Sequence, residues 1–99
     1  MKRLLVVADD FGLTPGINEG IVQAFQSGIL TFTSWLTNTV LFEEPAPRLR
    51  WLPGLGVGVH LALVGGRPVL PARDVPSLTR REGALRTSWK SFLPAWLAG

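Results

Sequence analysis

Cysteine is absent from the 99-residue sequence, and histidine occurs once, at His60. Without cysteine, the chain can form neither a disulfide framework nor a thiolate metal site. No apolar run approaches the roughly 20 residues that a membrane-spanning helix needs, so we expect no membrane span. The opening stretch, MKRLLVVADD, is too short for a signal peptide and runs into two acids without a small-residue cleavage site. We therefore expect a cytoplasmic protein.

Charged residues are few and basic ones prevail. They make up 17% of the sequence, against 46% hydrophobic residues, and the formal net charge is +3. This balance is too apolar for a disordered chain, and the length suits one small folded domain or part of a larger one. The positive charge gathers in the second half, where it is scattered among Pro and Gly without the aromatic-basic motif of a nucleic-acid-binding module. We therefore expect no nucleic-acid partner.

The first two thirds of the sequence predict strands that alternate with a helix. Three runs rich in β-branched and aromatic residues predict strands, at residues 3–8, 29–41 and 55–63. The first run is almost entirely apolar, so we expect it to be buried on both faces. Between the first two runs, a helix should begin after Thr14, with Pro15 in its first turn, and end at Gly28 in the left-handed C′ role. This alternation predicts an α/β fold with a parallel sheet.

The same helix should bury one side, because Ile17, Ile21 and Phe25 recur four residues apart. A short helix is expected within residues 43–51. After a long Pro- and Gly-rich loop, aromatic and leucine side chains recur at helical spacing over residues 87–97. Thr87 or Ser88 should cap this last helix, and Pro94 should kink or end it. We expect residues 1–64 to form a β/α core and residues 65–99 to form a loop followed by the aromatic helix.

Acidic and imidazole side chains fall at the ends of two predicted strands. Asp9 and Asp10 follow the first strand, and His60 lies towards the end of the third. Because the carboxyl ends of parallel strands meet at one edge, where ligands bind, we expect these side chains to lie close together. Carboxylate and imidazole suit a divalent cation such as Zn²⁺ or Mn²⁺ and, less ideally, Mg²⁺. Adjacent residues of a strand point in opposite directions, so one acid should be a ligand and the other a base, unless the chain turns there.

Each of these residues also has an ordinary structural explanation. An aspartate after a strand is often a loop residue or a helix cap. A lone histidine in a strand of Gly and Val is more often a hydrogen-bonded core residue than a metal ligand. The residue types and their spacing leave both explanations open.

Two segments in order, VVADDFGLTPGINEGIVQAFQSGILT and LGVGVHLALVGGRPVLP, resemble the amino-terminal part of the YdjC-like carbohydrate deacetylases. This family includes chitooligosaccharide deacetylases and hopanoid-biosynthesis-associated deacetylases. The resemblance is clear over residues 3–80 and weaker in the tail. It implies parallel β/α units that resemble the start of a (β/α) barrel-like fold, incomplete in this chain. It also implies a metal-dependent hydrolase that removes an N-acetyl group from an acetylated amino sugar or oligosaccharide.

The resemblance assigns roles to four residues. Asp10 and His60 would be ligands of a divalent metal, Mg²⁺ or Zn²⁺. Asp9 would be the general base that deprotonates the metal-bound water, and Arg67 would lie in a substrate-binding loop. Trp35 stands where a smaller aliphatic residue is expected. The third metal ligand and the general acid would lie outside this chain, which would correspond to the first third of such an enzyme.

The expected partners are an acetylated oligosaccharide and, because exposed barrel elements often pair, a second copy in a homodimer. The alternative is an inactive fragment or a non-enzymatic interaction module that docks on a partner through its aromatic helix, from Trp89 to Leu97.

Overall fold

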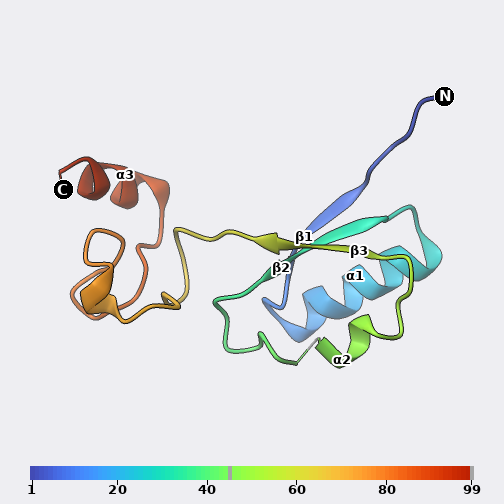
Figure 1. Cartoon of the computed structure of the whole chain (residues 1–99), viewed down its shortest axis with the longest axis horizontal. Helices are drawn as coiled ribbons and strands as arrows, with labels where there is room; N and C mark the ends of the chain where they lie inside the picture. The colour runs from blue at the N-terminus through green and yellow to red at the C-terminus, as the bar shows by residue number, and fades with distance from the viewer. Residues whose placement is uncertain (45, 99) are drawn as a thin grey trace. The chain divides into compact units, whose positions relative to one another are not determined.

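The computed structural model describes residues 1–44 and 46–98, which form two compact units that divide after Leu61. The first unit holds a three-stranded parallel sheet in the order β1-β2-β3. Its strands are β1 (Val7–Phe11), β2 (Phe32–Leu36) and β3 (Gly56–His60). Helix α1 (Pro15–Ser27) connects β1 to β2, and α2 (Ala46–Leu49) precedes β3; both lie along one side of the strands (Figure 1). The predicted α/β class is confirmed.

Helix α1 begins and packs as its sequence predicts. The Thr14 side chain accepts a hydrogen bond from the Ile17 backbone nitrogen at 3.2 Å, and Pro15 is the first helical residue. Ile21 is buried in the core, and Ile17 and Phe25 pack against it. The same buried cluster also contains Phe11, Leu30, Leu52 and Leu55. The core therefore lies between α1 and the face of the sheet that it covers.

The end of α1 differs from the prediction in its backbone geometry. The helix ends at Ser27, but Gly28 has a φ of −123° rather than the left-handed value expected of a C′ glycine. A Cβ at Gly28 would lie 2.7 Å from the Ala24 carbonyl oxygen. Gly28 is therefore required by close packing against the last turn, and not by a positive φ.

Strand β1 begins later than predicted and includes both acids. The expectation that its apolar run is buried on both faces is wrong, because the side chains of Leu4 and Val7 are 80% and 48% exposed. The physical reason is coverage: Leu4 lies before the first residue of β1, and both α1 and α2 lie along one side of the strands, so these helices cover only one face of β1 (Figure 1). Strands β2 and β3 lie within their predicted ranges but are shorter.

The second unit contains the 3-10 turn η1 (Ala72–Asp74) and helix α3 (Trp89–Leu97). Ser88 caps α3, accepting a hydrogen bond from the Ser91 backbone nitrogen at 3.4 Å. The helix runs through Pro94, so it does not end there. Proline has no backbone N–H, and the absence of this one donor at Pro94 does not end the helix. Among the residues that the structure describes, no helix is both long and apolar enough to cross a membrane.

A buried asparagine joins α1 to the loop that follows β1. Asn18 is fully buried; its Oδ1 accepts a hydrogen bond from the Gly12 backbone nitrogen at 2.7 Å. Its Nδ2 donates to Glu44 Oε2 at 2.9 Å. Gly12 itself has a φ of +93°, which disfavours any residue with a Cβ. Asn18 therefore holds the loop that directly follows the two acids.

We expect Asn18→Ala to lower the free energy of unfolding by about 1–3 kcal/mol, because it leaves the buried Gly12 N–H without its acceptor. Urea denaturation followed by circular dichroism measures the change. Gln23→Ala, an exposed position on the same helix, is the matched control and should have little effect. Equal unfolding midpoints for the two variants would contradict the role given to Asn18.

Candidate functional site

A bulge in β1 places two acids opposite one residue of β2. The register between the strands shifts between Ala8 and Phe11, so Asp9 and Asp10 together face Ser34. Asp10 has a φ of +71°, in the left-handed region that Asp and Asn tolerate better than most residues. The chain therefore turns at this point, and this is the condition under which neighbouring acids can face the same side.

Strand β3 brings the histidine to the same edge. In the β2–β3 register, Leu36 pairs with His60, and Ser34 pairs with Gly58. Ser34 and His60 are therefore on one face of the sheet, because side chains alternate along each strand. A Cβ at Gly58 would lie 3.0 Å from the Phe32 ring. The small residue in β3 thus leaves room for the Phe32 ring.

Four side chains meet at this edge. Ser34 Oγ donates a hydrogen bond to Asp9 Oδ1 at 2.6 Å and lies 3.1 Å from His60 Nδ1. His60 Nδ1 is 3.4 Å from Asp10 Oδ1. The side chains of Asp10 and His60 are 45% and 29% exposed, so water and solutes reach the site. The structure brings together the three residues that the sequence singled out, with Ser34 at their centre.

The donor set is incomplete for a metal ion. Over residues 1–44 and 46–98, no group of three or more His, Cys, Asp or Glu side chains is arranged to hold one. Asp10 and His60 offer a carboxylate oxygen and an imidazole nitrogen 3.4 Å apart. Two ligand atoms of a tetrahedral cation with bonds of about 2.0 Å are about 3.3 Å apart. The pair therefore fits two corners of such a site, and the other corners need further ligands.

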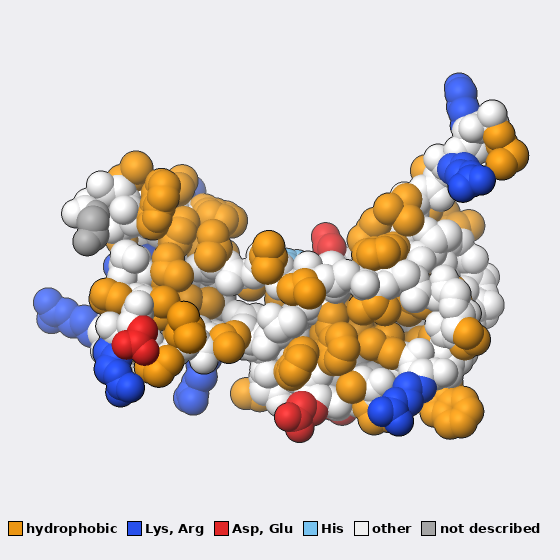
Figure 2. All heavy atoms as spheres, viewed as in Figure 1, with side chains coloured by type: hydrophobic (Ala, Val, Ile, Leu, Met, Phe, Trp, Pro, Cys, Tyr) orange, Lys and Arg blue, Asp and Glu red, His pale blue; other side chains and the backbone are white. Residues whose placement is uncertain are grey.

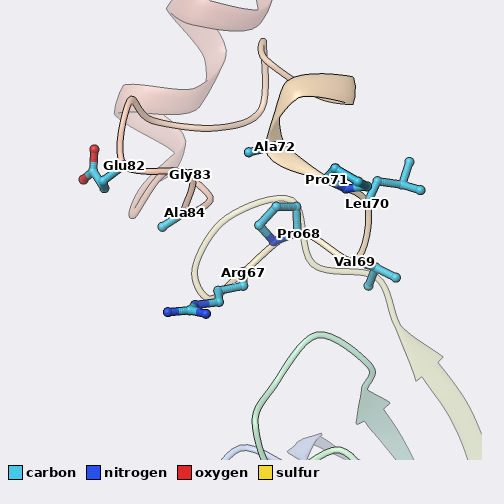
Figure 3. Close-up of a pocket in the computed structure, with 9 residues that line it drawn as sticks. All are labelled: Arg67, Pro68, Val69, Leu70, Pro71, Ala72, Glu82, Gly83 and Ala84. Carbon is cyan, nitrogen blue, oxygen red and sulfur yellow. The ribbon is translucent and has the colours of Figure 1, made fainter.

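Arg67 belongs to the second unit, where it lines a hollow. Figure 3 shows this hollow, in which the Arg67 guanidinium group extends away from Pro68. Its lining comes entirely from the second unit: Arg67, Pro68, Val69, Leu70, Pro71, Ala72, Glu82, Gly83 and Ala84. The strand-edge site comes entirely from the first unit. A substrate-binding role for Arg67 stays a prediction.

Sequence reasoning missed Ser34 and Asn18. Ser34 is the polar residue in the middle of the otherwise apolar face Phe32–Ser34–Leu36, and such a residue on a buried strand is a signal for a polar partner. Asn18 lies in the first turns of α1 among apolar positions, where a buried amide requires hydrogen-bond partners. In both cases the sequence does not identify the partner, because the partner lies on another segment of the chain.

Trp35, the residue unexpectedly large for its position, packs among aromatic rings. Its ring meets Phe11 edge-on with centroids 6.4 Å apart and stacks on Phe42 at 4.9 Å. A Cβ on Gly12 would lie 3.0 Å from the same indole. Trp35 thus packs closely against the loop that follows the bulge.

A family model described as YdjC-like protein matches residues 3–97. The chain belongs to the YdjC-like family. This confirms the resemblance carried by the ADDFG and GVHL segments.

Relatives in this family are much longer than the chain. A carbohydrate deacetylase from Brevibacillus brevis is 45% identical over 93 residues, which are 94% of this chain and 37% of that protein. A chitooligosaccharide deacetylase from Salmonella paratyphi B is 47% identical over 81 residues, which are 81% of this chain and 31% of that protein. The chain therefore spans about a third of the length of the curated relatives it matches.

A solved structure supports the fold. A candidate cellobiose-phosphate cleavage protein from Enterococcus faecalis superposes with a TM-score of 0.80 at 29% identity, over 95% of this chain and 43% of that one. The prediction of parallel β/α units that form part of a larger fold is confirmed.

Because of the bulge, replacing glycine by alanine should change the stability of the fold in opposite directions at the two neighbouring acids. We expect Asp10→Gly to be about 1–2 kcal/mol more stable than Asp10→Ala, because only the alanine has a Cβ that crowds the left-handed backbone. Both variants lose the carboxylate, so the difference isolates the backbone. The matched pair Asp9→Gly and Asp9→Ala should differ in the other direction, as glycine weakens a strand. Urea unfolding measures all four, and an Asp10→Ala at least as stable as Asp10→Gly would show that the bulge is absent.

Proposed function

We propose that this chain supplies the amino-terminal part of a metal-dependent carbohydrate deacetylase, which removes the N-acetyl group of an acetylated amino sugar or oligosaccharide. The observation that carries the proposal is the meeting of Asp9, Asp10 and His60 at one strand edge in a YdjC-like chain. The names of the relatives, carbohydrate deacetylase and chitooligosaccharide deacetylase, support the substrate class.

In this proposal Asp10 and His60 hold a divalent cation, Mg²⁺ or Zn²⁺. The 3.4 Å between Asp10 Oδ1 and His60 Nδ1 supports a shared ion. A cation bound there lowers the pKa of water and polarises the acetamide carbonyl. The remaining ligands would come from the part of the relatives' length that this chain does not span.

Asp9 is the general base. Its Oδ1 already accepts a hydrogen bond from the Ser34 hydroxyl. Oδ2 is therefore the oxygen that takes a proton from the attacking water. Addition of that water to the acetamide carbonyl, followed by cleavage of the C–N bond, releases acetate and a free amine. The group that protonates the amine is also placed outside this chain, and Arg67 is assigned to substrate contact.

The test is a full-length chimera in which this chain replaces the matching 93 residues of the Brevibacillus brevis relative. We expect metal-dependent release of acetate from N-acetylated chitooligosaccharides. Asp9→Asn should lower kcat by about two to four orders of magnitude, the usual contribution of a general base, and keep the bound metal. His60→Ala should lose bound metal and activity together. Acetate release and metal content are measured on the same samples.

Asp74→Asn is the matched control, because Asp74 is an exposed acid of the second unit that pairs with Arg73. It should leave turnover unchanged. Full activity in His60→Ala would contradict the metal assignment. A folded, metal-loaded chimera that releases no acetate would contradict the proposed reaction.

Docking through α3 is a second candidate function, favoured by the exposure of its aromatic side chains. Trp89 and Trp96 are 54% and 55% exposed. Hydrophobic side chains also gather on the visible surface of α3 in Figure 2. An apolar face of this kind is typical of surfaces that bind another protein.

If α3 is a docking element, the chain should self-associate, and Trp96→Ser should shift the sedimentation equilibrium towards monomer. Trp51→Ser is the matched control, because Trp51 is an exposed tryptophan of the first unit. A wild-type chain that stays monomeric at every concentration would argue against self-association through α3.

A further inference from the structure

We infer that Ser34 is a positioning residue, which fixes the neutral imidazole of His60 in the tautomer with its hydrogen on Nδ1. The inference rests on the proposed function for the importance of the site, but its physical basis is the contacts of Ser34 alone. Ser34 lies in the central strand β2, between the bulge of β1 and the end of β3.

The single hydroxyl proton of Ser34 has two candidate acceptors. Asp9 Oδ1 lies 2.6 Å away and His60 Nδ1 lies 3.1 Å away. A carboxylate is an acceptor only, and two oxygens at 2.6 Å repel each other unless a hydrogen lies between them. The proton therefore belongs to the Asp9 bond. Ser34 Oγ can then only accept from His60, which requires a hydrogen on Nδ1.

Asp10 leads independently to the same tautomer. Its Oδ1 lies 3.4 Å from His60 Nδ1. If Nδ1 carried a lone pair, that lone pair would face both a carboxylate oxygen and a hydroxyl oxygen with no hydrogen among the three. A hydrogen on Nδ1 turns both approaches into attractions.

The consequence is a defined state of the site before any cation binds. Ser34 links the base Asp9 to the ligand His60 through one hydroxyl, so the two side chains are oriented together. Nε2 is then the ring nitrogen that offers its lone pair, and Nδ1 becomes a ligand only by giving up its hydrogen. The shared ion proposed above, which uses Nδ1, therefore requires that hydrogen to move to Nε2 when the cation binds.

The tautomer can be read directly, because His60 is the sole histidine of the chain. Long-range proton–nitrogen correlation spectra of the chelator-treated, ¹⁵N-labelled chain distinguish hydrogen on Nδ1 from hydrogen on Nε2. Spectra are recorded with rising pH until the ring-nitrogen signals stop changing, so that the neutral form alone is observed. We expect the Nδ1–H form to dominate in the wild type.

Ser34→Ala should lower the ratio of Nδ1–H to Nε2–H about fivefold, as expected for the loss of one ordinary hydrogen bond. Ser34→Thr keeps the hydroxyl and should restore the wild-type ratio. Asp9→Ala is the second variant: it frees the Ser34 proton to bond Nδ1 and should also favour Nε2–H. Ser27→Ala, at an exposed serine of α1, should change nothing.

A dominant Nε2–H form in the folded wild type would overturn the inference. So would a Ser34→Ala variant with the wild-type ratio, since Asp10 alone would then set the tautomer. A wild-type chain without dispersed amide signals would also overturn it, because the first unit must hold these contacts. None of these readouts depends on turnover or bound metal, so the deacetylase proposal stands or fails separately in the chimera.

Discussion

The bulge in β1 is the constraint on which the rest of the site depends. In a regular strand, Asp9 and Asp10 would point to opposite faces, and only one could reach His60. The left-handed backbone at Asp10, with a φ of +71°, removes this alternation locally. One residue of β2, Ser34, then faces both acids. Bulges are common beside active sites because they redirect a side chain without disturbing the rest of the sheet.

The strain of the bulge is held by the loop that follows it, in which both backbone groups of Gly12 have hydrogen-bond partners. The N–H of Gly12 is bonded to Asn18, and its carbonyl oxygen accepts the Thr39 hydroxyl at 2.7 Å. Such pairing matters because Gly12 is buried, and a buried peptide group without a partner is costly. The helix, the loop and the turn after β2 therefore support one geometry. Unfavourable backbone angles persist where the surroundings determine them in this way.

Local signals predicted the local features of the fold well. The start of α1 followed from Thr14 and Pro15, because capping acts within one helix. The start of β1 did not follow in the same way. An apolar run such as LLVV fits a strand anywhere along its length, and pairing with β2, which begins at Val7, decides which part becomes one. The exposure of Leu4 likewise depends on which elements cover the sheet edge, and no local pattern contains that information.

The sequence by itself determined the chemistry available at this site: two adjacent acids after an apolar run, and a single histidine in a Gly/Val strand. It also determined the α/β class, because strand and helix patterns alternate along the chain. Only the tertiary structure decided that Asp9 and Asp10 both meet His60, Asp9 through Ser34 and Asp10 directly. That outcome depends on strand register and on one left-handed residue, and both are set by pairing between segments about 25 residues apart in the chain.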